Sequence, residues 1–338
     1  MHYFGYLNRT FEEETSMSWH IYKFVLHLEI WFIIAKMLHS TIFLNIHSSV
    51  KIYHQNWSNI FSFFYILNLI ECFFWILQRL LCLLLFEEIT IFGFQLSFFV
   101  SVGRCCCHFG SYFILALFMI ERCCATVFLQ TYDNRPRQYI SIILIMFGVS
   151  LSIFCGITFH LVNTTYIHLS IVVLANISAI SMNMFLTTLN KRYHASLRKK
   201  HGTYSLTQRY QVTENIKVCK VTKWMLIVFV LFNMISVGLL LTDNFNLGIH
   251  TQNVITMAFD INCYAYYLSV PHIVARHSPP LKAELKRLLK DIMAISSSKV
   301  SSEQDSAKIR DAFGREMQPR EGVADHFSNL QKFWDSSY

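Results

Sequence analysis

Four charged side chains lie in strongly apolar stretches of this 338-residue chain and are the residues best placed to do chemistry. They are Glu29, Lys36, Glu71 and Asp260. An ionisable group inside a membrane is costly, so it pairs with another group or serves a ligand or ion path. Two interpretations follow. The four residues form polar contacts between helices, or Asp260 and Glu71 line a ligand or ion site.

Other polar side chains surround two of these charges in the sequence. Asn262 and Tyr264 follow Asp260 closely and suit the wall of a polar pocket, and the same stretch contains no lysine that could hold retinal as a Schiff base. Glu29 and Lys36 are seven residues apart, which places them on one face of a helix about two turns from each other. Glu29, Lys36, Glu71, Asp260, Asn262 and Tyr264 are therefore the candidates for a ligand pocket or a polar core.

No pattern of catalysis or cofactor binding accompanies them. The sequence contains no P-loop, no HExxH and no GxSxG motif, and its ten cysteines form no CxxC pair. Residues 105–108 read Cys-Cys-Cys-His, but neighbouring helical residues point about 100° apart and cannot converge on one ion. We interpret this run as packing, and we expect no enzyme, no metal and no cofactor.

The elements that position these residues follow from the distribution of charge. Only 15% of the residues are charged, against about 25% in a soluble domain, and no Asp, Glu, Lys or Arg lies between Arg137 and Lys191. One spanning helix needs about 20 apolar residues, so this gap holds two. The sequence predicts an all-α membrane protein, a seven-transmembrane helix bundle with spans at 24–46, 57–79, 99–120, 139–160, 167–189, 222–242 and 251–273.

The orientation follows from the basic residues. With the N-terminus outside and the C-terminus in the cytoplasm, 24 of the 29 Lys and Arg residues fall on the inner side, as the positive-inside rule requires. The net charge of +8 is explained in this way and indicates no nucleic-acid partner. Glycosylation sequons at Asn8 and Asn163 then lie on the outer face.

An acid–arginine pair closes the third span at the inner surface. Glu121 can hold Arg122 in one state and release it to contact a partner protein in another. The alternative is an ordinary charge pair at the membrane interface. The inner segment that leads into span six is also basic, with Lys217 and Lys220, and its capping pattern predicts a helix from about residue 206 that runs directly into the span.

The chain is expected to have four parts. Residues 1–23 form an extracellular N-terminal segment, and residues 24–273 form the bundle. Residues 274–295 hold a short cytoplasmic amphipathic helix, which Ser278 caps ahead of Pro279 and which lies on the inner leaflet, with docking on a soluble partner as the alternative. Residues 296–338 are rich in Ser and charge and form a disordered cytoplasmic tail.

Short motifs give the chain a resemblance to the nematode seven-transmembrane chemoreceptors, closest to serpentine receptor class epsilon. Residues 121–126 (ERCCAT), followed by Tyr132-Asp133, are similar to the ERxxAT pattern of that family. The other matching segments are NKRY at 190–193, YSLTQRYQ at 204–211 running on to Glu214-Asn215, and YHQNW at 53–57. The alpha and beta classes of the same superfamily share parts of this pattern.

The resemblance implies a G-protein-coupled receptor that senses a small environmental molecule at the plasma membrane of a sensory neuron. Its partners would be the lipid bilayer, a small-molecule ligand and a heterotrimeric G protein, with Glu121, Arg122, Lys217 and Lys220 at the coupling face. The chain departs from rhodopsin-like receptors because span seven lacks NPxxY and span six lacks CWxP. A ligand-gated channel or small-solute transporter, with Glu29, Lys36, Glu71 and Asp260 along its path, is the alternative.

Overall fold

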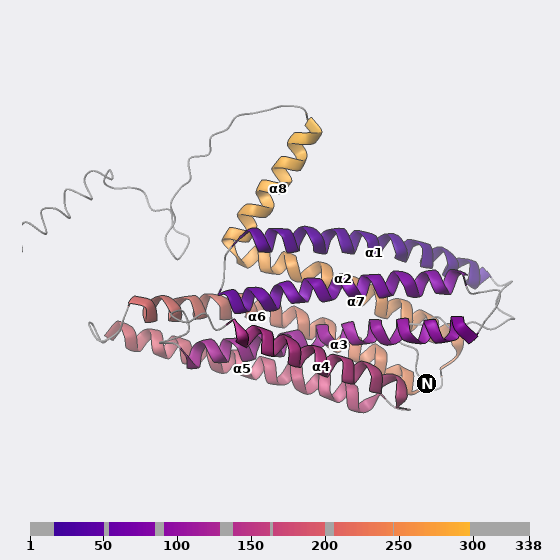
Figure 1. Ribbon diagram of the computed structural model, residues 1–338, viewed down its shortest axis with the longest axis horizontal. Helices are drawn as coiled ribbons and strands as arrows, with labels where there is room; N and C mark the ends of the chain where they lie inside the picture. The colour runs from indigo at the N-terminus through magenta and orange to yellow at the C-terminus, as the bar shows by residue number, and fades with distance from the viewer. Residues whose placement is uncertain are drawn as a thin grey trace, which may run out of the picture. The chain divides into compact units, whose positions relative to one another are not determined.

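Every regular element in the part of the chain that the structure describes is a helix (Figure 1). This computed structural model describes residues 17–50, 54–84, 91–128, 138–162, 165–199, 206–245 and 247–297. The elements are α1 (Met17–Ser49), α2 (Gln55–Leu84), α3 (Ile91–Val127), α4 (Tyr139–Leu161), α5 (Tyr166–Lys199), α6 (Leu206–Leu241), the 3₁₀ turn η2 (Thr242–Asn244), α7 (Ile249–His277) and α8 (Pro279–Ser297).

Six of these helices, α1 to α6, are long and apolar enough to cross a membrane. The stretches that qualify run from 23 residues in α4 to 34 residues that begin in α6, and about 20 apolar residues suffice for one crossing. The all-α membrane class is therefore confirmed. α7 coincides with the seventh predicted span but is not among the six, because polar residues such as Asp260 and Asn262 interrupt its apolar sequence.

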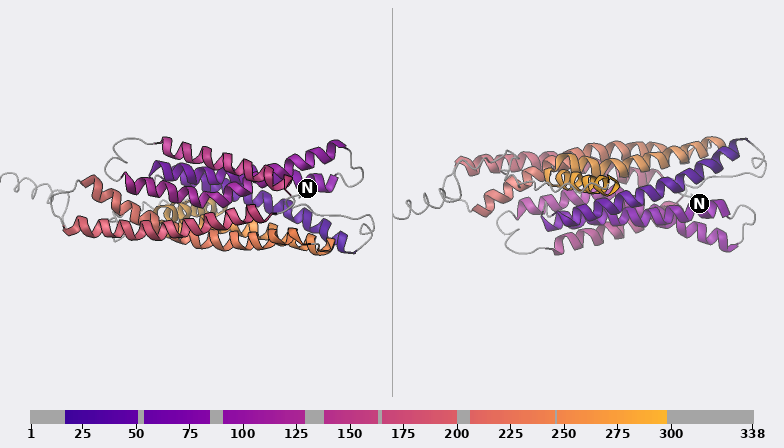
Figure 2. Two further views of the ribbon diagram at one scale, coloured as in Figure 1. Left: turned by 90° about the horizontal axis from the view of Figure 1, so that it is seen from below. Right: turned by 90° about the horizontal axis from the view of Figure 1, so that it is seen from above.

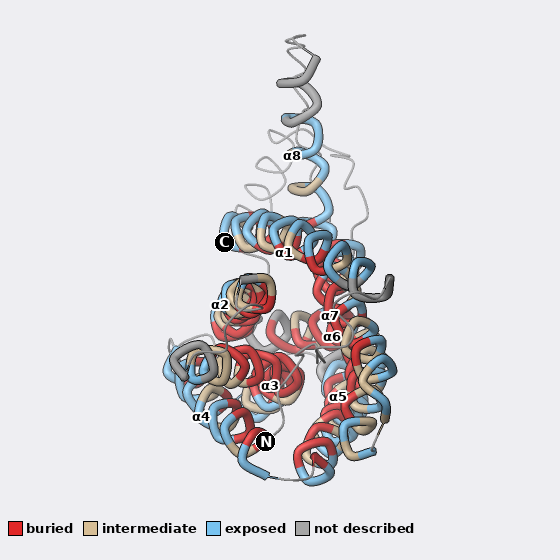
Figure 3. The backbone as a smooth tube through the Cα atoms, turned by 90° about the vertical axis from the view of Figure 1, so that its right-hand side faces the viewer, coloured by how far each residue is buried: buried red, intermediate tan, exposed pale blue. Residues whose placement is uncertain are grey.

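α3 is the central helix of the bundle. It packs most extensively against α2 and α4, and also against α5 and α6. Around it, α1 packs on α2 and α7, and α6 packs on α5 and α7. The two further views in Figure 2 show the long helices running side by side, and in Figure 3 the buried residues gather on the helix faces that point at one another.

The outer surface of the bundle is apolar, as a surface in contact with lipid must be. On α4, Ile143, Phe147 and Phe154 are each more than half exposed. The charged side chains Glu29, Lys36 and Asp260 are by contrast almost completely buried. Apolar residues outside and charged residues inside reverse the pattern of a soluble protein, and this distribution supports the membrane class independently of hydropathy.

A glycine allows α4 to approach α3 closely. A Cβ atom added to Gly156 would lie 2.4 Å from the sulfur of Cys106 and 2.9 Å from its backbone nitrogen. Small residues at helix contacts serve this purpose in membrane proteins, where close van der Waals packing drives association. Gly156 therefore fixes the spacing of α3 and α4, and with it the position of the polar side chains that α3 presents to the interior.

Two predictions about the helix ends had different outcomes. α6 starts at Leu206 and continues without a break to Leu241, which confirms the predicted helix leading into span six. α8 starts at Pro279 as predicted, but Oγ of Ser278 makes no hydrogen bond to any described residue, so the predicted side-chain cap is wrong. Pro280, at the second helical position, carries no backbone N–H, which removes one of the two donors that such a cap would bind.

The chain divides into two compact units, residues 1–285 and 286–338. The helix bundle belongs to the first unit, and the described part of the second is the end of α8. Of the predicted N-terminal segment, residues 1–23, the structure describes only the part from Met17, where α1 begins. Of the predicted tail, residues 296–338, it describes only the part up to Ser297, where α8 ends.

Candidate functional site

Asp260 of α7 accepts hydrogen bonds from two arginines on two other helices. Nη2 of Arg79, from α2, donates to Oδ2, and Nη2 of Arg104, from α3, donates to Oδ1. All three side chains are completely buried. One carboxylate thus ties α2, α3 and α7 together through charge-assisted bonds, the strong class of protein hydrogen bond.

The two arginines extend this arrangement in different directions. Nε of Arg79 lies 2.7 Å from Oε2 of Glu29, which brings in α1. Arg104 donates from Nη1 to Oε1 of Gln78 at 2.8 Å, and its guanidinium group lies 4.1 Å from the ring centre of Trp75. Each cation therefore has both an anionic partner and a second contact that orients it.

A second set of ionic contacts surrounds Glu71 of α2. Nζ of Lys36 lies 3.7 Å from Oε2 of Glu71, and Nδ1 of His108 lies 3.3 Å from Oε1. Nε2 of His108 is in turn 2.8 Å from the hydroxyl group of Tyr112. The ammonium group of Lys36 also lies over the ring of Tyr267, 3.7 Å from its centre.

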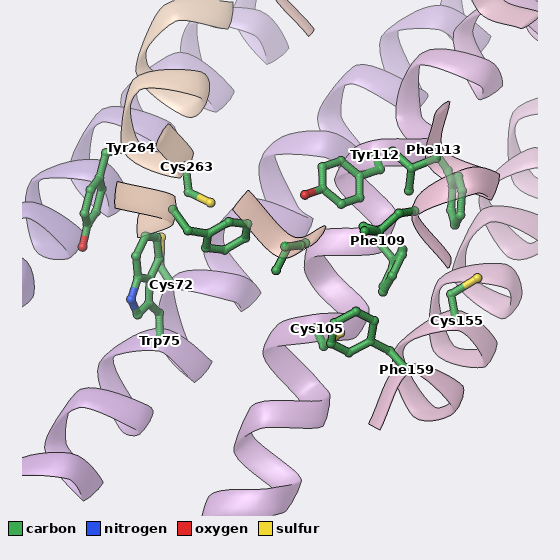
Figure 4. Packing of buried hydrophobic residues seen from close by; sticks show 14 of the residues in the cluster. Cys72, Trp75, Cys105, Phe109, Tyr112, Phe113, Cys155, Phe159, Cys263 and Tyr264 are labelled. Atoms are coloured by element: carbon green, nitrogen blue, oxygen red, sulfur yellow. The ribbon is translucent and has the colours of Figure 1, made fainter. Parts of the chain in front are cut away.

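Trp75 stands between the two sets. Its ring receives the Arg104 guanidinium at 4.1 Å and the Lys36 ammonium at 4.9 Å. Tyr264 stacks on it with a centroid distance of 4.5 Å and an interplanar angle of 14°, and Figure 4 shows these two rings side by side beside Cys72 and Cys263. Trp75 belongs to a cluster of buried hydrophobic residues, so the charges beside it are embedded in the packed core of the bundle.

We call the charged residues of both sets the buried ion network. Its members are Glu29, Lys36, Glu71, Arg79, Arg104, His108 and Asp260. Three carboxylates face three permanent cations, so the formal charges cancel if His108 is neutral. Such balance is what burial in a low-dielectric interior demands, because an unpaired buried charge is strongly destabilising.

The structure divides the pocket candidates among different contacts. Glu29 and Asp260 share Arg79, and Lys36 pairs with Glu71, so Glu71 and Asp260 belong to separate ion pairs. The hydroxyl group of Tyr264 donates to the carbonyl oxygen of Glu29 at 3.3 Å. Asn262 lies apart from the network, because its amide donates to α6, to the Phe232 carbonyl and to Ser236.

Sequence reasoning missed three members of the network, Arg79, Arg104 and His108. Arg79 is the last residue of the predicted second span and Arg104 lies inside the predicted third span, so both were visible as intramembrane charges. His108 was assigned to packing together with the cysteines that precede it. Cys105 does lie in the core, but the imidazole of His108 contacts Glu71 and Tyr112 instead.

A separate polar cluster lies near the other end of α3. Arg122 donates from Nε and Nη2 to the two oxygens of Glu121, both at 2.5 Å, and from Nη1 to Oδ1 of Asn215 on α6 at 3.1 Å. Arg122 and Glu121 are both buried. The structure places this pair inside the helix packing.

The same cluster reaches α5. Thr126 donates to the carbonyl oxygen of Arg122 at 2.9 Å, and Asn190 of α5 donates to Oγ1 of Thr126 at 3.1 Å. We call Glu121, Arg122, Thr126, Asn190 and Asn215 the Arg122 cluster. Arg104 and Arg122 are 18 residues apart on α3, about 27 Å along the axis, so the ion network and the Arg122 cluster are distinct sites on one helix.

Two of the four remaining predicted site residues lie among the described residues, and two do not. Lys217 and Lys220 are exposed on α6. Asn8 and Asn163, the predicted glycosylation sites, lie outside the described residues.

Comparison with known proteins identifies the family. A family model described as the Sre G protein-coupled chemoreceptor matches residues 6–335. Serpentine receptor class epsilon-13 of Caenorhabditis elegans is 24% identical over 347 residues, which cover 98% of this chain and 96% of that protein. Serpentine receptor class epsilon-12 of the same organism is 25% identical, with coverage of 100% and 99%. The resemblance noted in the sequence motifs is confirmed, and the chain belongs to the Sre family of chemoreceptors, a family of multi-pass membrane receptors rather than enzymes.

Proposed function

We propose that this chain detects a small environmental molecule at the plasma membrane of a sensory neuron and signals to a heterotrimeric G protein. The observation that carries the proposal is the Arg122 cluster. A buried arginine, held by its neighbour Glu121 and by Asn215 of α6, joins the two helices whose separation would open a docking face. The family match supports the receptor class.

The proposal requires α7 to be the seventh span, with the N-terminus outside. Asp260, the most costly residue of α7, is neutralised by Arg79 and Arg104 inside the bundle. An inward-facing, paired charge does not meet lipid, so the lower hydropathy of α7 is compatible with a crossing. Seven crossings with the N-terminus outside also leave most of the Lys and Arg residues on the inner side.

In this mechanism the ligand favours one packing of the helices over another. Separation of α6 from α3 would break the bond between Arg122 and Asn215 and release the guanidinium group towards the G protein. The exposed side chains of Lys217 and Lys220 lie on the same helix as Asn215, two and five residues further along. They would supply positive charge that steers an acidic surface of the G protein towards this face.

The test is a chemical-panel screen of cells that express the chain, with second-messenger and current readouts in parallel. We expect responses that require a G protein, and we expect Arg122→Ala to abolish them at unchanged surface expression. Lys23→Ala, an exposed substitution on α1 at the opposite end of the bundle, is the control and should respond normally. A current that persists without G proteins would overturn the proposal in favour of a ligand-gated channel.

A further inference from the structure

The ammonium group of Lys36 is buried without a hydrogen bond. Its side chain is 1% exposed, and Nζ has no hydrogen-bond partner among the residues that the structure describes. The nearest acceptor in the ion network, Oε2 of Glu71, is 3.7 Å away, beyond normal hydrogen-bond distance. An ammonium group has three N–H donors, and here they face the rings of Tyr267 and Trp75.

Two polar atoms near the Lys36 ammonium group are also buried without a hydrogen bond. Oε2 of Glu71 and Nε1 of Trp75 are buried, and neither has a hydrogen-bond partner among the described residues. Glu71 uses its other oxygen for His108, and the side chain of Tyr267 also contacts this carboxylate. Leaving a buried donor or acceptor unused costs about 1–3 kcal/mol, more for a charged group. The two members of this ion pair, Lys36 and Glu71, therefore need a common explanation.

The Lys36 ammonium group and Oε2 of Glu71 together determine which chemical group of a ligand could form hydrogen bonds with both. The Lys36 ammonium can donate to an oxygen, and Oε2 of Glu71 can accept from an O–H. A hydroxyl group both accepts and donates, so it complements both residues at once. A carbonyl oxygen would satisfy Lys36 alone, and a hydrocarbon would satisfy neither.

The charge balance of the network argues against an ionic ligand. Lys36, Arg79 and Arg104 already offset Glu29, Glu71 and Asp260. A carboxylate or an ammonium added beside Lys36 would leave one net charge in the core of the bundle, where an uncompensated charge is strongly unfavourable. The surrounding surface is aromatic, with Trp75, Tyr264 and Tyr267, and aromatic faces suit an apolar body.

We propose that Lys36, Glu71 and Trp75 form a subsite for a neutral, hydroxyl-bearing small molecule with an apolar body. Lys36 donates to the hydroxyl oxygen, and Glu71 accepts the hydroxyl proton in a hydrogen bond. Trp75 provides the aromatic wall between these residues and Arg104. The subsite names the class of ligand for the proposed receptor function and rests on that function.

The experiment measures binding directly, so it is independent of G-protein coupling. Full-length receptor in lipid nanodiscs is titrated with five six-carbon probes: 1-hexanol, 2-hexanone, hexane, hexanoate and hexylamine. The readout is the midpoint of thermal unfolding. We expect 1-hexanol to bind most tightly, about 3- to 10-fold better than 2-hexanone for the loss of one net hydrogen bond, with hexane weaker still. Tighter binding of hexanoate or hexylamine, or equal binding of 1-hexanol and hexane, would overturn the proposal.

Substitutions of Lys36 and Glu71 test whether 1-hexanol binds at these two residues. Lys36→Met/Glu71→Gln keeps the core neutral and should abolish the preference for 1-hexanol over hexane. The control Ser40→Ala/Asn68→Ala removes another polar pair between α1 and α2, in which Asn68 donates to Ser40 at 2.5 Å, and should keep the preference. If Lys36→Met/Glu71→Gln does not fold, Lys36→Met/Glu71→Met, which also removes one base and one acid together, should lose the preference as well. A preference that survives in these variants would overturn the subsite, whereas normal binding without signalling would overturn only the coupling proposal.

Discussion

Arg122 of α3 donates a hydrogen bond from Nη1 to Oδ1 of Asn215 on α6, at 3.1 Å and in a buried position. The amide nitrogen of Asn215 faces back to α3, 3.5 Å from the carbonyl oxygen of Ala125. Because both ends of the Asn215 amide contact α3, this residue holds the two helices together at the end where we propose that the G protein binds.

Asn215→Ala should raise signalling in the absence of ligand. The substitution removes the bond across the helices but leaves Arg122 paired with Glu121, so it favours separation of α6 without stranding a charge. The measurement is basal second-messenger output at matched surface expression. Asn233→Ala, which breaks a polar contact between α6 and Asn176 of α5, is the control and should leave the basal output unchanged. Unchanged basal output in Asn215→Ala would contradict a restraining role for this bond.

Asp260→Asn should destabilise the bundle strongly. The substitution leaves Arg79 and Arg104 buried with one carboxylate fewer, and breaking a buried ion pair costs about 3–5 kcal/mol. Thermal unfolding of purified receptor in nanodiscs measures the loss. Asp291→Asn, at an exposed aspartate of α8, is the control and should have little effect.

Restoring the charge balance should recover part of this stability. In Asp260→Asn/Arg104→Gln one acid and one base are removed together, so the remaining charges again cancel. The double variant should unfold at a higher temperature than Asp260→Asn alone. If it is no more stable than the single variant, the ion network is not held together by charge balance.

Gly156→Ala should destabilise the contact between α3 and α4. The added Cβ would lie 2.4 Å from the sulfur of Cys106 and 2.9 Å from its backbone, so the helices must separate, at a cost of about 1–3 kcal/mol for overpacking. Gly238→Ala is the matched control, because nothing lies within 4 Å of the Cβ that it adds. That change should be neutral or stabilise α6 by up to about 1 kcal/mol. Equal unfolding midpoints for the two variants would refute the role assigned to Gly156.

The positions of the helices were predictable because the absence of charge marks a membrane span directly. Each of the seven predicted spans falls on a helix, and α4 at Tyr139–Leu161 agrees with the prediction to within one residue. The other helices extend further than the apolar stretches. α1 begins at Met17 and α3 at Ile91, because hydropathy marks where lipid begins and a helix can continue beyond that point.

The ion network was only half predictable. The four charges named from the sequence, Glu29, Lys36, Glu71 and Asp260, sum to −2, and this imbalance called for two more buried cations. Arg79 and Arg104 are these cations, and the predicted spans already contained them. Which acid meets which base could not be predicted, because it depends on the rotation and spacing of the helices. Those are set by packing contacts such as Gly156 against Cys106.

The number of membrane crossings decides whether this chain has receptor topology, because that topology requires α7 to cross the bilayer. Among the described residues, the helices that are apolar enough by composition are α1 to α6. Epitope tags at the two ends of the full chain, probed with antibody before and after permeabilisation of the cells, report the side on which each end lies. We expect the N-terminal tag to be accessible in intact cells and the C-terminal tag only after permeabilisation. Two tags on the same side would mean an even number of crossings, and α7, the proposed orientation and the coupling face at Arg122 would all have to be abandoned.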